Sequence, residues 1–191
     1  LGQLMGSLGK KKEAAEYEKR AKAYRNVWCD SVQWFRARMK GGGWLPWRGR
    51  PAQDQGTTES NPFQQGWFVP HDIDGMKALM GGQKKFDAEL EEFFANVPED
   101  FLWNDYYNHP NEPNHVPFLF NYSSCPWLTQ KWTRKICDKA YGDDVLGLCG
   151  NEDVGQMSAW YVLAAMGIHP VCPGNPRYEI TSPVFESVEI N

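Results

Sequence analysis

The feature that most constrains the fold of this chain is a helical hydrophobic pattern that occurs in three pairs, each pair interrupted by glycine. Apolar residues recur every three or four positions within residues 1–28, 72–98 and 126–166, and the interruptions fall near Gly9, Gly81 and Gly142. This spacing puts side chains on one face of a helix, and glycine commonly follows a helix end. The sequence therefore predicts three helical hairpins and a mainly α fold.

Two long segments between the predicted hairpins have a different character. Residues 39–68 and 98–117 hold much of the glycine, proline, asparagine and tryptophan. Neighbouring helices need only about two to eight connecting residues, so longer loops are usually functional. We therefore expect the chemistry in these loops. Beyond Gly167 the pattern alternates at residues 178–180 and 184–190, which predicts strands.

Composition excludes several classes of protein. The 191 residues carry 20 Lys and Arg against 24 Asp and Glu, a net charge of −4, and 41% of them are hydrophobic. Such a chain forms one domain or a large part of one. Basic runs are confined to Lys10, Lys11 and Lys12, so nucleic acid is not an expected partner. Apolar stretches stay far below the roughly 20 residues that cross a bilayer, so no membrane span is expected.

The cysteines and one sequon bear on the compartment. Five cysteines form no C-x-x-C pair, which argues against a zinc site or a dithiol redox couple. Asn121-Tyr122-Ser123 is an acceptor for N-glycosylation. Together with the odd number of cysteines, it fits a secreted or secretory-pathway protein. No targeting peptide is visible, and because the chain opens inside a predicted helix we expect its natural start to lie upstream.

Nine tryptophans accompany many carboxylates, a combination typical of sugar sites, because aromatic faces stack on sugar rings and carboxylates bind hydroxyls. Five tryptophans have helical spacing and are expected in the core: Trp28, Trp34, Trp127, Trp132 and Trp160. The others lie in loops and are candidates for stacking: Trp44, Trp47, Trp67 and Trp103.

One polar segment runs from a glycine turn directly into a predicted helix, with the sequence GNEDVGQMSAWY at residues 150–161. One interpretation is structural, because Asp153 followed by Gln156 matches a capping box. The other makes Asp153 a catalytic base, which the helix N-terminus would keep ionised. The sequence leaves both interpretations open.

Two loop segments offer further polar groups. Glu59 stands in an irregular loop, where solvated surface is the alternative to a catalytic role. Residues 109–115, HPNEPNH, gather oxygen and imidazole groups between prolines that fix the backbone. Oxygen-rich groups suit a hard cation such as calcium, whereas His115 alone is more often a hydrogen-bonded structural residue.

Three motifs carry a resemblance to a known family. Residues 150–161, followed by GIHPVCPG at residues 167–174, resemble the signature of the calcium-dependent exo-α-mannosidases of glycoside hydrolase family 92. ESNPFQQGWFVPHD at residues 59–72 is similar to the family's EGNxWQYxWFVPHD, and NEPNHVPFL at residues 111–119 to its NEPSHxPYL. The motifs occur in the family's order, and the resemblance is strong over residues 57–186.

The resemblance implies an (α/α)6 toroid of six helical hairpins joined to β-sandwich elements. Three hairpins are about half of a toroid, which gives a partial (α/α)6 catalytic domain at residues 1–168 and the start of a C-terminal β-strand region at residues 169–191. The family's N-terminal β-sandwich domain is absent from this sequence. We therefore expect the carboxyl-terminal part of a longer enzyme, inactive by itself, whose partner is the missing N-terminal part of the same polypeptide.

The resemblance also implies an activity: removal of terminal α-linked mannose from mannose-rich glycans, as in N-glycan processing. Glu59 falls at the position of the general acid and Asp153 at that of the general base of an inverting mechanism. Such an acid needs a raised pKa, which we expect from partial burial near Trp67 and Phe68. Calcium would bind O2 and O3 of the mannose. The implied metal ligands are Glu112 and Asn114. The implied substrate-binding residues are Trp67, Asn111, Glu112, His115 and Asn151.

Some positions depart from the family pattern. Ser60, Phe63 and Gln65 replace glycine, tryptophan and tyrosine, and Asn151 stands where some members carry aspartate. Both implied catalytic carboxylates are present, which favours an active enzyme. Two alternatives stay open. Another six-hairpin glycosidase would act on a different sugar and need no calcium, and a carbohydrate-binding helical domain would bind mannose disaccharides without turnover.

Overall fold

The structure is a computed structural model that describes residues 1–110 and 114–190. Among these residues, no helix has the length and apolarity needed to cross a bilayer. The described chain is mainly helical, and its elements in order are α1 (Gly2–Ser7), α2 (Lys11–Ala21), the 3-10 helix η1 (Ala23–Val27), β1 (Trp28–Cys29), β2 (Trp34–Phe35), α3 (Pro62–Gln65), α4 (Ile73–Met80), α5 (Gln83–Ala95), the 3-10 helix η2 (Val116–Tyr122), α6 (Trp127–Lys139), α7 (Gln156–Met166), β3 (Ile168–His169) and β4 (Glu179–Ile180).

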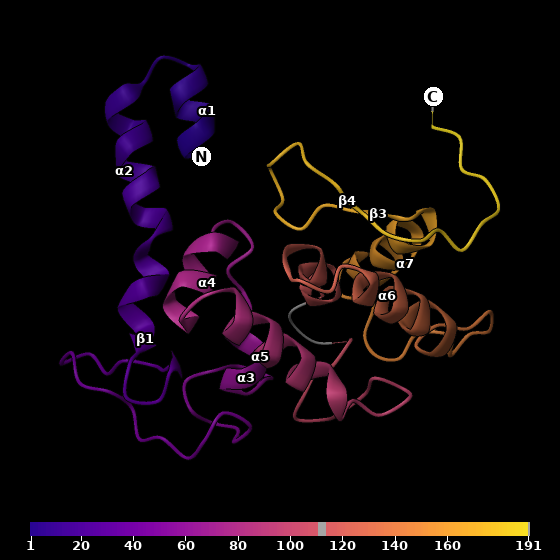
Figure 1. The fold of residues 1–191 in the computed structure, drawn as a ribbon, viewed down its shortest axis with the longest axis horizontal. Coiled ribbons are helices and arrows are strands. Elements are labelled where there is room, and N and C mark those ends of the chain that lie inside the picture. The colour runs from indigo at the N-terminus through magenta and orange to yellow at the C-terminus, as the bar shows by residue number, and fades with distance from the viewer. Residues whose placement is uncertain (111–113, 191) are drawn as a thin grey trace.

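The three predicted helical hairpins are confirmed. α1 contacts α2, α4 contacts α5 and α6 contacts α7, and Figure 1 shows the pairs in chain order from left to right. Asp72 is the N-cap of α4, and its carboxylate accepts a hydrogen bond from the Gly75 N–H at 3.1 Å. Gly81 is the C-cap of α4, and its φ of +96° is in the left-handed region that glycine adopts without strain.

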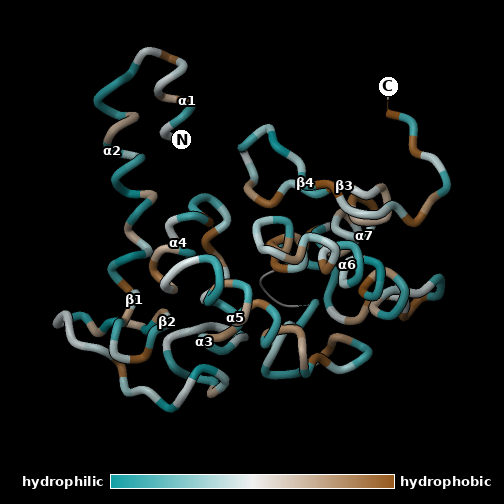
Figure 2. Tube along the Cα trace, viewed as in Figure 1, coloured by the Kyte–Doolittle hydropathy of each residue, from teal (hydrophilic) through white to brown (hydrophobic). Residues whose placement is uncertain are grey.

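The hydrophobic core lies among the second and third hairpins and the loops beside them. Phe93 of α5 contacts Phe63 of α3 with 4.8 Å between ring centroids, and the neighbouring Phe94 stacks on Tyr107 at 4.8 Å. α2 consists mostly of hydrophilic residues (Figure 2), and Ala14 is its buried residue. The buried residues of α5 have the spacing of one helix face: Phe86, Leu90, Phe93 and Phe94.

The strands are short and form two antiparallel pairs. β1 pairs with β2, and β3 pairs with β4 so that Ile168 lies opposite Ile180. The predicted strand at residues 178–180 is therefore confirmed in β4, but the one at residues 184–190 is wrong. That segment is mostly exposed, and within the described residues no strand lies beside it to complete a ladder. The domain boundary between residues 168 and 169 falls inside β3 and stays a prediction.

The tryptophans expected in the core divide into two groups. Trp28, Trp34 and Trp160 are buried, and Trp132 packs against the core while partly exposed. Trp127 is 60% exposed, so its prediction is wrong. Trp127 has the helical spacing of the buried residues, but as the first residue of α6 it precedes the part of the helix that packs against the core.

Candidate functional site

Side chains from three loops meet around one cavity of about 400 Å³. The loops are the one before α3, the one after α5 and the connection between α6 and α7. The two carboxylates singled out in the sequence, Glu59 and Asp153, therefore share a cavity of a size common for small-molecule sites, roughly 300–1,000 Å³. Its lining residues are Thr58, Glu59, Ser60, Trp103, Pro110, Gly150, Asn151 and Asp153.

Each of the three loops contributes one cavity-lining residue, other than glycine, that has a left-handed backbone. φ is +55° at Glu59, +47° at Trp103 and +52° at Asp153. Residues with a β-carbon seldom adopt this conformation, and a side chain as bulky as tryptophan is strained in it. Strained residues persist where their surroundings hold them, and they cluster at ligand sites and active sites. Their coincidence at one cavity indicates a functional site.

The first turn of α3 fastens the loop before it to the loop after α5. Asn61 Oδ1 accepts from the Gln64 N–H at 2.9 Å, and Gln64 Oε1 accepts from the Asn61 N–H at 3.0 Å, which completes a capping box. The Gln64 amide donates to the carbonyls of Asn104 and Tyr106, both at 2.8 Å. Because Asn61 and Gln64 are buried, these bonds fix the two loops beside each other.

Glu59 itself is exposed. The prediction that it is partly buried near Trp67 and Phe68 is wrong. Trp67 is 0% exposed in the core, and Phe68 lines other cavities. The reason is the intervening helix: Glu59 precedes α3 on a surface loop, whereas Trp67 follows α3 and packs into the core.

Asp153 does not cap α7, so the structural interpretation of its segment is wrong. The N-cap is Gly155, and no side chain makes the capping bond. φ is positive at residues 153, 154 and 155, which turns the chain before the helix can begin. Glu152 serves the first turn instead, because its carboxylate accepts from the Ser158 N–H at 3.2 Å and from the Ser158 hydroxyl at 2.8 Å. Asp153 remains exposed at the cavity.

Two residues expected to bind substrate lie in the interior. The Trp67 ring is 0% exposed and lies 5.5 Å from the Trp34 ring, so the prediction that it contacts substrate is wrong. Burial lowers the pKa of His115 to about 4, and the neutral ring donates from Nε2 to the Trp67 carbonyl at 3.1 Å. His115 thus has the structural role that was its alternative. Trp103, 75% exposed at the cavity, is the tryptophan placed to stack on a ligand.

The implied metal ligands are only partly described. Asn111 and Glu112 lie outside the described residues. Asn114 is 6% exposed, and its Oδ1 is buried without a hydrogen-bond partner in the described parts of the chain. Burial of an amide oxygen without a hydrogen-bond partner destabilises the fold, and such an oxygen is a hard ligand of the kind that calcium binds. Asn114 therefore fits as one calcium ligand, although within residues 1–110 and 114–190 no group of three or more His, Cys, Asp or Glu could hold a metal.

Pro110 and Gly150 are cavity residues that the sequence reasoning missed. A β-carbon on Gly150 would lie 2.2 Å from Cβ of Pro110, so the approach of these two loops requires glycine. The available signal was a glycine directly before the polar run at residues 151–153, since an isolated glycine beside functional groups often marks a close backbone approach.

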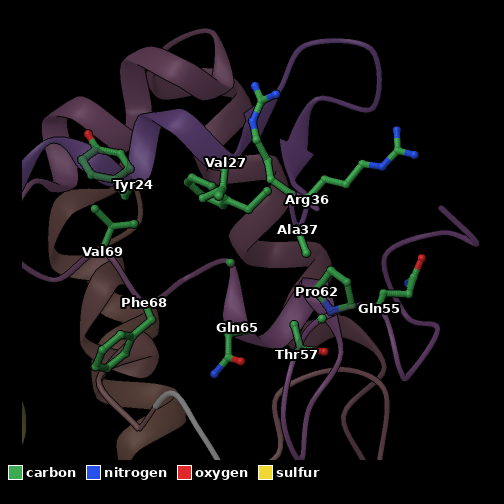
Figure 3. Close-up of a pocket in the computed structure, with 14 residues that line it drawn as sticks. Tyr24, Val27, Arg36, Ala37, Gln55, Thr57, Pro62, Gln65, Phe68 and Val69 are labelled. Carbon is green, nitrogen blue, oxygen red and sulfur yellow. The ribbon is translucent and has the colours of Figure 1, made fainter. Parts of the chain in front are cut away.

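A separate cavity of about 330 Å³ adjoins the loop before α3 (Figure 3). Its lining is mostly apolar and includes Val27, Ala37 and Val69, and no carboxylate stands among its described lining residues. The Gln55 amide that lines it has no donor left for a ligand, because its Nε2 already donates to the carbonyls at residues 49 and 52, both at 2.7 Å. The carboxylate cavity is therefore the better candidate for chemistry.

Comparison of the sequence with known proteins points to one family. The profile described as "Glycosyl hydrolase family 92 catalytic domain" matches residues 1–191. A curated relative from Arthroderma benhamiae, called "Uncharacterized secreted glycosidase", is 34% identical over 140 residues, which are 73% of this chain and 17% of that protein.

Solved structures agree with the sequence match. The family GH92 alpha-mannosidase BT3965 from Bacteroides thetaiotaomicron superposes with a TM-score of 0.86 and 35% identity, over 95% of this chain and 24% of that chain. The same enzyme has been solved in complex with mannoimidazole. The family GH92 inverting mannosidase BT2199 from that organism gives a TM-score of 0.85 at 33% identity, over 97% of this chain and 27% of that chain. The predicted fold class, part of a helical toroid, is thereby confirmed, and the chain spans about a quarter of the length of these enzymes.

Proposed function

Because this chain belongs to glycosyl hydrolase family 92, we propose that the longer protein of which it forms a part removes terminal α-linked mannose from mannose-rich glycans. The single observation that carries the proposal is the meeting of Glu59 and Asp153 at one cavity. The names of the solved relatives support it, since two are mannosidases and one of these was solved with mannoimidazole bound.

The proposed reaction is a single displacement with inversion. Asp153 takes a proton from a water molecule, which attacks the anomeric carbon of the terminal mannose, and Glu59 protonates the leaving oxygen. This mechanism requires carboxyl groups roughly 6.5–9.5 Å apart, with the water and the sugar between them. A cavity of about 400 Å³ has room for both. One relative is itself described as inverting.

Binding in this cavity would use the remaining lining groups. The exposed ring of Trp103 offers a flat face to the C–H face of a sugar ring. Asn151, two residues before Asp153, offers an amide that can donate to and accept from hydroxyls. Asn111 and Glu112 remain predicted substrate-binding residues outside the described part of the chain.

Calcium completes the proposal for the longer protein. Asn114 Oδ1 would be one ligand, because it is buried and has no partner among residues 1–110 and 114–190, and Glu112 is the other residue predicted to bind the metal. When bound, calcium would hold two neighbouring hydroxyls of the mannose and fix the sugar ring for attack.

A secreted location is also proposed. The curated relative is named a secreted glycosidase, and Asn121 belongs to a sequon. Secretion would bring a glycosidase of this kind to glycans outside the cell or along the secretory pathway.

The test is turnover of α-linked mannobiose by the full-length protein, compared with its Asp153→Asn and Asp143→Asn variants. Asp143 is exposed in the same connection between α6 and α7 but does not line the cavity. We expect turnover by the wild type and by Asp143→Asn, and its loss in Asp153→Asn without a change in melting temperature. Asparagine tolerates the left-handed backbone at residue 153, so the fold is preserved. Binding of mannobiose by the wild type without turnover would contradict the proposal and favour a carbohydrate-binding domain.

A further inference from the structure

A buried histidine that the proposed mechanism does not use lies beside the cavity. His109 is 0% exposed and directly precedes Pro110, which lines the cavity. Its Nδ1 is 2.6 Å from Tyr107 Oη, and its Nε2 is 2.7 Å from Tyr141 Oη. A buried side chain with both polar atoms hydrogen-bonded is held in one orientation. It therefore fixes the segments that it joins relative to each other.

These two bonds belong to a series of three hydrogen bonds that links Tyr107, His109, Tyr141 and the Met157 carbonyl. The direction of each bond follows from the last one in this His109 series. The Tyr141 hydroxyl donates to the Met157 carbonyl at 3.0 Å, so its single proton is committed there. It must then accept from His109 Nε2–H, which leaves Nδ1 to accept from the Tyr107 hydroxyl. Burial lowers the pKa of His109 to about 3, so the ring is neutral and this one tautomer satisfies all three bonds.

The series ends at the backbone that carries Asp153. Met157, in the first turn of α7, is 1% exposed and donates its N–H to the Glu152 carbonyl at 3.2 Å. The neighbouring Gln156 N–H donates to the Asp153 carbonyl at 3.2 Å. The loop after α5, the end of α6 and the start of α7 are thus joined through His109 and Tyr141.

Residues 153–155 need such a constraint. All three have positive φ, and no side chain caps the helix that follows. A left-handed backbone at two residues with β-carbons is unfavourable unless the surroundings impose it. The contacts at Met157 fix the first turn of α7 against the rest of the fold.

We propose that His109 and Tyr141 are positioning residues that hold Asp153 at the cavity. The role of Asp153 in this statement rests on the proposed function. Loss of the Tyr141 hydroxyl would remove the bond between residue 141 and the Met157 carbonyl and leave the His109 N–H without its acceptor, and residues 150–157 would relax. Displacement of a reacting group by about 1 Å can lower a rate about a hundredfold.

The experiment compares Tyr141→Phe with Tyr122→Phe in the full-length protein. The Tyr141 ring stacks on Trp160 with 6.0 Å between centroids and an angle of 5° between planes, and phenylalanine keeps that packing. The Tyr122 hydroxyl donates a hydrogen bond to Glu179 Oε1 at 2.5 Å, which Tyr122→Phe also removes, but Tyr122 does not line the cavity. The matched variant therefore controls for the general cost of a lost hydroxyl.

For Tyr141→Phe we expect kcat to fall about a hundredfold with KM within about twofold of the wild type, on aryl α-mannosides and on mannobiose alike. Amide hydrogen exchange at residues 150–157 should become about tenfold faster. Tyr122→Phe should show neither change. Should Tyr141→Phe fail to fold, Tyr107→Phe removes the donor at the other end of the series and should give smaller changes in the same direction.

A wild-type kcat in Tyr141→Phe, or a rise in KM with kcat unchanged, would overturn the proposal. Unchanged exchange at residues 150–157 would also overturn it, and this readout needs no substrate. If the wild type hydrolyses no α-mannoside, the proposed function fails, whereas faster exchange in the variant would still show that the series positions this segment.

Discussion

At the residue scale, Glu59 and Asp153 share one setting, yet the proposed mechanism requires opposite protonation states of them. Both are exposed, and both have left-handed backbone at the same cavity. An acid must keep its proton until the leaving oxygen needs it, whereas a base must be ionised when water attacks.

Replacement of the acid should affect substrates according to their leaving groups. For Glu59→Gln in the full-length protein, we expect kcat on mannobiose to fall by about 10²–10⁴-fold, the usual contribution of general acid catalysis. Aryl α-mannosides with a good leaving group should be largely spared, because their departing oxygen needs little protonation. Steady-state kinetics on both substrates checks this. Glu99→Gln, at an exposed glutamate outside the cavity lining, is the matched control. Equal losses on both substrates would remove Glu59 from the acid role.

At the element scale, one carboxylate joins the second hairpin to the segment that follows the first. Asp72 caps α4 through the Gly75 N–H, accepts from the Tyr24 hydroxyl at 2.7 Å and lies 3.6 Å from the Arg25 guanidinium. Burial alone would raise the pKa of Asp72, but the bonds from Tyr24 and Gly75 and the charge of Arg25 hold it below its ordinary value. Because the folded-state pKa is lowered, this stabilisation is present at neutral pH and is lost as pH falls through that lowered value.

Removal of this carboxylate should therefore destabilise the fold at neutral pH. We expect Asp72→Ala to cost about 2 kcal/mol, from the lost cap and the unpaired Tyr24 hydroxyl. Asp74→Ala is the matched control, because Asp74 lies in the first turn of the same helix with a side chain that is 96% exposed and an ion pair to Lys77 of 3.8 Å. Thermal unfolding at pH 7 checks both. Equal shifts in the two variants would contradict the role assigned to Asp72.

The helices were predictable from the sequence because their signals are local. The spacing on α5 and the stop at Gly81 each depend on a few neighbouring residues. The capping interpretation of Asp153 is wrong although the residue types match a capping box. Three left-handed residues separate Asp153 from the start of α7, and the Glu152 carboxylate bonds the first turn of that helix instead. Trp67 failed for a different reason: a loop residue can still point into the core, and sequence spacing does not report burial.

At the scale of the whole molecule, the candidate site depends on contacts between distant segments. The sequence indicated that Glu59 and Asp153 matter, through their motifs, and it offered Trp103 as one of four stacking candidates, but the part played by Pro110 and Gly150 follows only from the packing of the loops. The His109 series could likewise not be predicted from the sequence, since the partners of His109 at residues 107, 141 and 157 have no common motif.

Two buried histidines and one partly buried histidine make the stability of the molecule sensitive to mild acid. Burial lowers the pKa of His109 to about 3, of His115 to about 4 and of His169 to about 3. The unfolded chain binds protons near the ordinary pKa of 6.5 while the folded chain does not, so stability is complete above that pH and is lost as pH falls below it. Between pH 6.5 and 5, each histidine should cost about 2 kcal/mol.

His169→Phe tests this directly. Phenylalanine preserves the stack on Phe118, whose ring lies 4.1 Å from that of His169, and it removes a buried Nδ1 that has no partner among the described residues. The melting temperature of the variant should exceed that of the wild type by more at pH 5 than at pH 7.5. His71→Phe, at an exposed histidine, is the control. An equal gap at both pH values would show that His169 does not contribute to the acid sensitivity.

Removal of metal should abolish activity in the full-length protein. We expect turnover of α-mannosides to stop after exhaustive chelation and to return with calcium more readily than with magnesium. Calcium tolerates irregular oxygen sites such as one built on the Asn114 amide, whereas magnesium demands near-octahedral geometry. Asn114→Leu should raise the calcium concentration needed for half-maximal activity. Full activity in the chelated protein would remove calcium from the account.

The stereochemistry of the first product tests the roles of Glu59 and Asp153 directly. If Asp153 activates water while Glu59 protonates the leaving oxygen across the same cavity, the full-length protein must release β-mannose from an α-mannoside. Proton NMR of the anomeric region in the first minutes, before mutarotation equilibrates the two forms, measures this. We expect the β-anomer signal to appear first and the α-anomer signal to grow later. Initial release of α-mannose would contradict the roles assigned to Glu59 and Asp153.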